Sequence, residues 1–126
     1  MDYTGPRLHT AQQLVERIQA LLTADEATAK VHATMNPDEI TSGATNGVVM
    51  VSLPTLSSPN FAQLDVKWEV HVISGPANNW LAAWDRLDTI LEVLFEGQLN
   101  IDTAEPANYP AKNGPALPAY TITLNE

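Results

Sequence analysis

Residues 64–96 read LDVKWEVHVISGPANNWLAAWDRLDTILEVLFE and combine two periodicities, separated by a Gly-Pro-Ala-Asn-Asn turn. Before the turn, apolar and polar side chains alternate, which is typical of a strand with one solvent-facing side, and we predict this strand over residues 63–74. After the turn, apolar residues recur at three- and four-residue spacing from Trp80 to Glu96, which predicts an amphipathic helix. A strand joined closely to a helix that can cover it indicates an α+β fold.

The helix predicted after the turn has recognisable ends and one apolar stripe. Its N-cap is expected at Asn78 or Asn79, and Gly97 is a typical C-terminal stop. The stripe expected to pack on the sheet consists of Trp80, Trp84, Leu87, Leu91, Leu94 and Phe95. Burial of this stripe predicts that Trp84→Ala costs about 3–5 kcal/mol. Val93 lies outside the stripe on the predicted solvent side, where we interpret it as a contact with another subunit.

Weaker patterns predict the remaining elements. A capping box at Thr10 and Gln13 begins an apolar stripe that indicates a helix over residues 10–23. Alternating or continuous apolar runs indicate the other strands, which cover residues 27–35, 47–53, 99–103 and 120–124. The predicted order is therefore α-β-β-β-α-β-β, a mostly antiparallel sheet with two amphipathic helices packed on it.

Residues 1–126 are expected to form a single domain, because a chain of this length can bury a substantial core. Residues 1–9 are predicted to be an extended N-terminal arm. Three connections are unusually long, at 36–47, 54–62 and 104–119, and the prolines and Asn-Gly of the last are expected to exclude regular structure. Long loops on a small domain are either functional or disordered.

The composition excludes several classes of protein. The chain has no cysteine, which removes thiolate catalysis and disulfides, and its six Lys and Arg residues are dispersed in a chain of net charge −9. Nucleic-acid readers need clustered cations, so specific DNA binding is not expected. The acidity serves either solubility or a surface that repels DNA, and composition does not separate these two. The sequence has neither an apolar leader nor the roughly 20 apolar residues of a membrane span, so secretion and membrane insertion are not expected.

The residue pattern offers no catalytic or metal-binding constellation. His9, His32 and His71 fall on different predicted elements, and none has a second histidine at metal-ligand spacing. Glu69 and His71 share the polar face of their strand with Asp65, a set that suits either a cation or an ordinary solvated surface. Nucleophile-elbow and phosphate-binding glycine motifs are missing. We therefore predict a protein that is not an enzyme and has no cofactor, no metal and no catalytic residue.

Three features of the element order are shared with a known group of proteins. A helix at 10–23 leads into a meander of strands. The long strand LDVKWEVHVISG at 64–75 is followed within a few residues by the helical segment WLAAWDRL at 80–87. A C-terminal strand at 120–124 is reached through a proline-rich loop. In these features, which cover most of the chain, it resembles the tail terminator and tail-to-head joining proteins of long-tailed bacteriophages.

The resemblance implies a structural virion protein. Such proteins form a ring, usually a homo-hexamer, on the last ring of the tail tube, where they stop its polymerisation and present a face to the head connector or stopper protein. DNA passes through the lumen of the ring without specific binding. The resemblance thus implies a location at the head–tail junction of the virion, after assembly in the host cytoplasm.

Two of the long loops are the predicted contact regions of such a ring. We expect loop 36–47 to contact the tube or a neighbouring subunit and loop 104–119 to contact another neighbour, because each carries hydrophobic side chains among polar ones. With the valine of the second helix, the predicted interface consists of Asp38, Glu39, Ile40, Val93, Tyr109 and Leu117. Deletion of residues 38–45 should leave a folded monomer that no longer caps tails.

Other functions fit the same pattern. A head-side neck adaptor or stopper would also form a ring, but it would face the portal. A monomeric small-ligand binding domain would use the sheet face as a pocket and bind an apolar molecule near Trp68. A hydrolase or metal enzyme ranks last among these alternatives.

Overall fold

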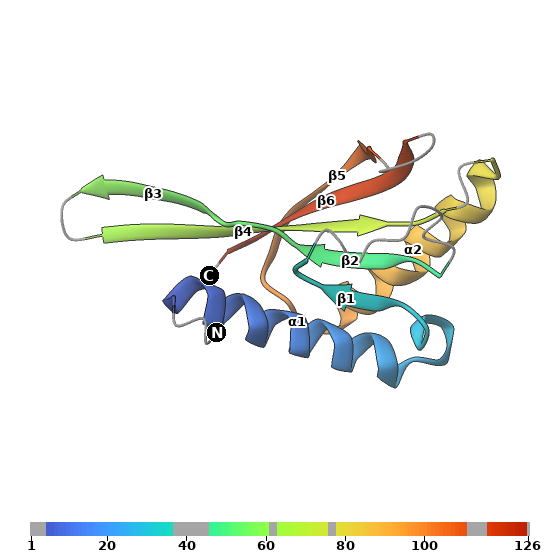
Figure 1. Ribbon diagram of the computed structural model, residues 1–126, viewed down its shortest axis with the longest axis horizontal. Coiled ribbons are helices and arrows are strands. Elements are labelled where there is room, and N and C mark those ends of the chain that lie inside the picture. The colour runs from blue at the N-terminus through green and yellow to red at the C-terminus, as the bar shows by residue number, and fades with distance from the viewer. Residues whose placement is uncertain (1–4, 37–45, 61–62, 76–77, 111–115, 126) are drawn as a thin grey trace.

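The computed structural model describes residues 5–36, 46–60, 63–75, 78–110 and 116–125. In this part of the chain, two helices pack on a six-stranded, mostly antiparallel sheet (Figure 1). The elements in chain order are α1 (Pro6–Ala24), the 3₁₀ turn η1 (Glu26–Thr28), β1 (His32–Thr34), β2 (Val48–Val51), β3 (Thr55–Asn60), β4 (Gln63–Ile73), α2 (Trp80–Glu96), β5 (Ile101–Tyr109) and β6 (Leu117–Asn125). The predicted α+β class is confirmed.

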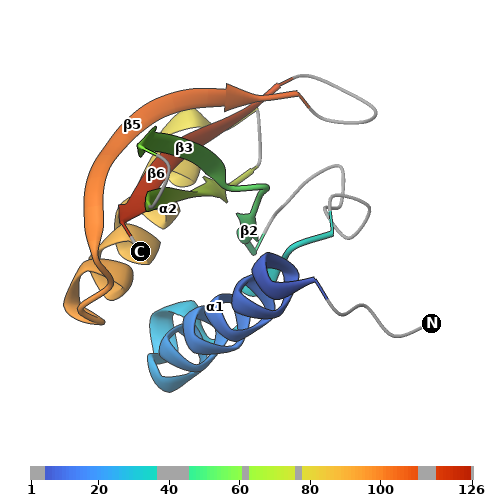
Figure 2. The ribbon, with the colours of Figure 1, turned by 90° about the vertical axis from the view of Figure 1, so that its left-hand side faces the viewer.

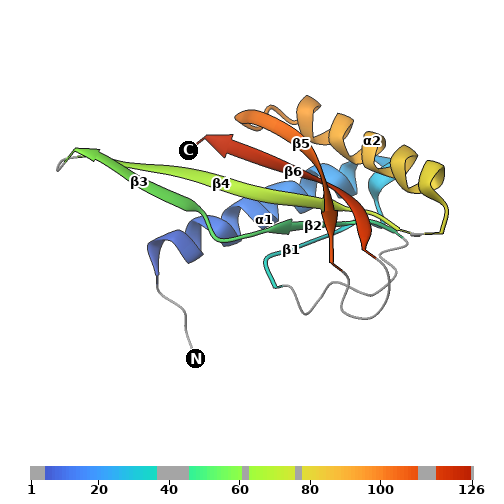
Figure 3. The ribbon, with the colours of Figure 1, turned by 90° about the horizontal axis from the view of Figure 1, so that it is seen from above.

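Strand β4 is the centre of the sheet. The strand order is β1-β2-β4-β6-β5, with β3 also paired to β4, and all pairs are antiparallel except β1 with β2. Along one edge of β4, β3 pairs with its first half and β2 with its second half. Because the β4–β6 pairing begins only at Lys67, residues 63–66 pair with β3 alone. The β3–β4 hairpin therefore projects beyond the rest of the sheet (Figures 1 and 3).

One apolar core lies between the helices and a single face of the sheet. The alternation predicted for β4 is confirmed, because Trp68, Val70 and Val72 are all buried on that face. Ile18 from α1 and Ile90 from α2 are fully buried in the same core. A second, smaller cluster on the other face of the sheet contains Val48, Ile73, Leu117 and Ala119, with Tyr109 packed against it.

Helix α1 begins earlier than predicted. Its N-cap is Gly5 and Pro6 is the first helical residue, so residues 6–9 belong to the helix and the predicted arm at 1–9 is wrong in that part. Proline suits the first turn because its φ is already helical and its missing N–H needs no partner. Thr10 is therefore an interior residue rather than the N-cap, and its Oγ1 donates to the Pro6 carbonyl at 3.1 Å.

Two predicted loops contain strands. Residues 54–62 hold β3, and residues 104–119 hold most of β5 and the start of β6, although both regions contain prolines. Proline interrupts a sheet only where a backbone N–H would have to donate to a neighbouring strand. Edge strands and strand ends have positions where no such hydrogen bond is made. Pro59 and Pro106 lie in β3 and β5, which have a partner on one side only, and Pro118 precedes the first β4–β6 pair.

The strand predicted over residues 27–35 is shorter than expected. Only His32–Thr34 forms β1, and Glu26–Thr28 forms the turn η1. The Asp25 side chain accepts a hydrogen bond from the Ala27 backbone N–H at 2.9 Å, which stabilises the turn. The neighbouring alanines have little preference for a strand, so residues 26–28 form the turn instead of extending the strand.

Strand β5 bends as it crosses the edge of the sheet (Figure 2). Its register with β6 shifts between Ile101 and Thr103, which marks a β-bulge. A bulge places an extra residue in one strand and increases its bend and twist. The bend lets β5 continue to Tyr109, beyond the end predicted at residue 103, while staying paired with β6.

The ends of α2 are confirmed. The helix runs from Trp80 to Glu96, and the Asn79 side chain caps it by accepting a hydrogen bond from the Ala82 backbone N–H at 3.2 Å. Gly97 is the C-cap. A side chain at Gly97 would collide with Leu21 of α1, so glycine allows the two helices to approach closely at this point.

The buried face of α2 differs from the predicted stripe. Trp80, Trp84 and Phe95 are about half exposed, whereas Val93, predicted to face solvent, is buried. The buried set is Ala83, Leu87, Ile90, Leu91, Val93 and Leu94. The reason is that α2 contacts η1 and α1 on one side as well as β4 and β6, so its covered face is wider and turned away from the tryptophans.

Gly47 provides a test of the packing between α2 and the sheet. Its φ is +83°, and a Cβ atom there would lie 2.9 Å from Ile90 Cδ1 and 3.3 Å from Arg86 Cδ. We expect Gly47→Ala to lower the free energy of unfolding by about 2–4 kcal/mol, from left-handed backbone strain plus overpacking. Gly5→Ala is the control, because its φ is −61° and its nearest neighbour would be Leu8 Cβ at 3.9 Å. Equal urea midpoints for the two variants would contradict this packing.

Candidate interaction surfaces

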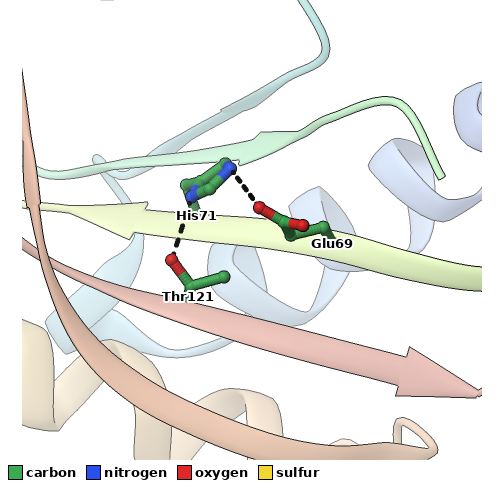
Figure 4. Close-up of polar contacts among 3 residues, drawn as sticks. All are labelled: Glu69, His71 and Thr121. Atoms are coloured by element: carbon green, nitrogen blue, oxygen red, sulfur yellow. Dashed lines mark hydrogen bonds and ion pairs between the residues drawn. The ribbon is translucent and has the colours of Figure 1, made fainter. Parts of the chain in front are cut away.

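The open face of the sheet carries a small polar cluster at its centre. Glu69 Oε1 lies 3.2 Å from His71 Nε2, and Thr121 Oγ1 lies 3.2 Å from His71 Nδ1 (Figure 4). The ring of Tyr109 is tilted towards the imidazole, with 6.3 Å between ring centroids. The His71 side chain is 19% exposed, so both of its nitrogens are engaged in a largely covered position.

The cluster is a hydrogen-bonded group on the open face of the sheet. A hydroxyl, an imidazole and a carboxylate in series also occur in hydrolases, but hydrolysis needs a substrate cleft and donors for the oxyanion. The cavities that described residues line at α1, at the hairpin and along α2 do not include Glu69, His71 or Thr121. The described residues also contain no group of three His, Asp or Glu side chains that could hold a metal ion.

The hydrogen bond to His71 has a measurable expected effect. Thr121→Val keeps the shape of the side chain but removes the hydroxyl that contacts Nδ1, so we expect a loss of about 1 kcal/mol in the free energy of unfolding. Thr123→Val is the matched control on the same strand and face, since the Thr123 hydroxyl makes no side-chain hydrogen bond within the described residues. Equal urea midpoints for the two variants would show that the hydrogen bond between Thr121 and His71 is not formed in solution.

A patch of apolar side chains is exposed at the start of α2. Trp80 is 55% exposed, Leu81 73% and Trp84 48%, and we call these three residues the tryptophan patch. A shallow cavity of about 170 Å³ separates the two tryptophans from Pro106, Pro118 and Tyr120 of the β5–β6 hairpin. A cluster of this size is larger than the single exposed apolar residues that are normal on a surface, so it indicates an interaction site.

A groove lies between the start of α1 and the end of β2. It has a volume of about 460 Å³ and is lined mainly by apolar side chains. We call it the α1–β2 groove, and its lining consists of Arg7, Leu8, Ala11, Met35, Met50, Val51, Ser52, Leu53, Pro54 and Trp68. Leu53 is 89% exposed, the most exposed of the large hydrophobic residues described.

The projecting β3–β4 hairpin has an apolar face of its own. Leu56 is paired with Val66 across the hairpin, and Leu64 lies on the same face, two residues before Val66. Further along β4 this face is buried under the helices at Trp68 and Val70, but Leu56 and Leu64 are about half exposed. The hairpin therefore exposes to solvent the same face of the sheet that the helices cover further along β4.

The residues of the predicted interface lie in different settings in the structure. Asp38, Glu39 and Ile40 lie outside the described residues. Val93 is part of the core, and Tyr109 and Leu117 are paired across β5 and β6 rather than being in a loop. Leu117 is only 2% exposed, and Tyr109 packs against the small cluster on the open face.

Sequence reasoning missed most of the exposed apolar residues. Leu81 could have been found from the sequence, because it falls on the polar side of the predicted helix where no core residue is needed. Leu53 directly precedes Pro54 at the end of a predicted strand. It is also a large apolar residue at a position where a core residue is less expected. Leu56 lay in a region predicted to be a connection, so its place on a strand face could not be inferred.

The chain matches no protein-family model and no curated protein. Neither helix in the described ranges combines the length and the apolar character that crossing a bilayer requires. The exposed apolar surfaces described above and the net charge of −9 are the features of this chain that bear on its function.

Proposed function

We propose that this protein is a non-enzymatic ring subunit that caps the tail tube of a long-tailed bacteriophage and joins it to the head connector. The observation that carries the proposal is the exposure of unlike apolar surfaces at opposite ends of one small subunit. The start of α2, which carries the tryptophan patch, lies at one end of the molecule. The start of α1, which lines the α1–β2 groove, and the β3–β4 hairpin lie towards the other end (Figures 1 and 3).

Unlike surfaces at opposite ends favour head-to-tail association. When a surface on one copy binds a different surface on the next, the assembly is heterologous and closes into a ring if the rotation between neighbours permits. Each copy in such a ring uses both of its ends, which removes both apolar surfaces from water. A homo-hexamer is the size that the resemblance to tail terminators implies.

The projecting hairpin suits the capping role. A subunit that ends a polymer needs one face complementary to the tube and an opposite face that does not reproduce the growing surface. A two-stranded hairpin is marginal alone, so the exposed Leu56 and Leu64 favour a bound partner, which we propose is the tail tube protein. An acidic subunit also favours a lumen through which DNA passes without binding.

Electron microscopy of the purified protein, alone and mixed with tail tubes, tests the proposal. We expect rings of one size, tubes that carry such a ring at one end, and no further growth of those tubes when tube protein is added. Tubes that grow normally in the presence of a molar excess of the protein would refute the capping function. Rings that bind a portal or connector but leave tail length normal would instead support a head-side adaptor.

A small-ligand binding domain is the second candidate, and the α1–β2 groove favours it. The volume of about 460 Å³ lies within the range of roughly 300–1,000 Å³ of many ligand sites, and buried Trp68 lines it. This candidate predicts a protein that stays monomeric in sedimentation equilibrium at high concentration and binds 1-anilinonaphthalene-8-sulfonate stoichiometrically. Self-association that displaces the dye would exclude it in favour of the ring.

A further inference from the structure

We propose that the tryptophan patch of one subunit docks into the α1–β2 groove of the next, with Asp85 of the first opposite Arg7 of the second. The inference builds on the proposed ring and names the two surfaces that join its subunits. Its occupant is a second copy of this chain.

One surface is hollow and the other exposes large side chains. The groove has an apolar lining between α1 and β2, and the patch consists of exposed apolar side chains on the first two turns of α2. Trp80, Leu81 and Trp84 are all at least 48% exposed, so their side chains are free to enter a neighbour. Tryptophan is among the residues that contribute most to binding when its ring is enclosed at the centre of an interface.

The positions of the two surfaces suit head-to-tail contact. The patch is on the first two turns of α2 and the groove is lined by the first turns of α1. The start of α2 lies at one end of the molecule, and the start of α1 lies towards the other, near the β3–β4 hairpin (Figure 1). In a head-to-tail pair, one patch and one groove stay free, and each can accept a further copy. This repetition is what a closed ring needs.

Charge favours this contact over other contacts between two copies. With 15 acidic and six basic residues, two copies repel each other across most of their surfaces. Among the described residues that line the groove, Arg7 is the charged one, and none is Asp or Glu. Asp85 stands one turn after Leu81 on the same side of α2, and within the described residues neither Arg7 nor Asp85 forms an ion pair.

Engineered cysteines test the contact directly, because the chain has none of its own. Leu53→Cys marks the groove and Leu81→Cys marks the patch, and both positions are so exposed that the fold should be unaffected. Under mild oxidation, a mixture of the two single variants should form a disulfide-linked dimer. The double variant should form a ladder of linked subunits that ends at the ring size.

Two single-variant controls establish the direction of the contact. Leu53→Cys alone and Leu81→Cys alone should remain unlinked, because like surfaces do not meet in a head-to-tail ring. A disulfide dimer from either single variant with none from the mixture, or a double variant whose linked products stop at the dimer, would overturn the proposal in favour of a two-fold contact. Circular dichroism of each variant before oxidation verifies that the subunits are folded.

Charge reversal tests the Arg7–Asp85 contact independently. Arg7→Glu and Asp85→Arg should each weaken self-association about tenfold, and the double variant should recover most of the loss, because the pair is restored with opposite orientation. Lys30→Glu and Glu16→Arg are matched charge controls at exposed positions outside both surfaces. Additive losses in the double variant would overturn the pairing.

The outcomes separate this contact from the proposed function. Rings in electron microscopy without a mixed disulfide would overturn the docking and leave the ring subunit intact as a proposal. Mixed disulfides in a protein that does not arrest tube growth would support the docking and refute the capping function. A protein that stays monomeric and unlinked at high concentration would overturn both.

Discussion

Ile90→Ala is expected to lower the free energy of unfolding by about 2–5 kcal/mol. Ile90 is fully buried in α2, in the core between the helices and the sheet, and its Cδ1 lies close to the backbone of Gly47. A cavity at this position has little freedom to collapse, because glycine has no side chain that could move into it. Urea titration of the two proteins, at concentrations where both are monomeric, measures the difference.

Trp84→Ala is the matched comparison on the same helix. The sequence alone predicts a cost of about 3–5 kcal/mol for Trp84, on the assumption that its ring is buried. Because Trp84 is 48% exposed, we now expect about 1 kcal/mol in the monomer. A larger loss for Trp84 than for Ile90 would show that the predicted stripe, and not the observed one, faces the core.

The sequence predicts well the features that depend on local pattern. Alternation from Leu64 to Ile73 identified β4 because one face of that strand is covered and the other is open. Asn79 and Gly97 located the ends of α2 because caps act through neighbouring backbone groups. These signals need no knowledge of what packs against them.

The features that were missed depend on where other elements end. The rotation of α2 is decided by η1 and α1, which cover Val93 and leave the tryptophans half exposed. Leu56 and Leu64 follow the same alternation as the core residues of β4, but β6 is not paired with this part of the strand. The exposure of these two leucines depends on where the neighbouring strands end. The periodicity of the sequence does not contain this information, so it could not locate the candidate surfaces.

The prolines led to a different kind of wrong prediction, a loop where the structure has paired strands. The prolines of residues 104–119 predict irregular structure, yet Pro106 and Pro118 both lie in the β5–β6 pair. A strand tolerates a proline where the missing N–H would have pointed away from any neighbouring strand. The sequence does not show which side of a strand lies at the edge of the sheet. The same prolines place Tyr109 and Leu117 in a predicted contact loop, whereas in the structure both residues lie in paired strands and pack within the subunit.

Shortening the β3–β4 hairpin is expected to abolish capping while leaving the subunit folded. Leu56 and Val66 are directly paired, so residues 57–65 can be removed and the two strands joined there by an Asn-Gly turn. The deleted part of β4 pairs with β3 alone, and none of the deleted residues whose burial the structure describes belongs to the buried core. The free energy of unfolding should therefore change by no more than about 1 kcal/mol.

Tail length then measures the function of the hairpin. If it binds the end of the tube, tubes assembled with the shortened protein should grow beyond their normal length, as they would with no terminator present. A full-length variant with Leu56→Asp and Leu64→Asp should give the same result, because it removes only the exposed apolar contacts. Normal tail lengths with both variants would show that the tube is bound elsewhere on the subunit. Loss of rings together with loss of capping would instead assign the hairpin to the contact between subunits.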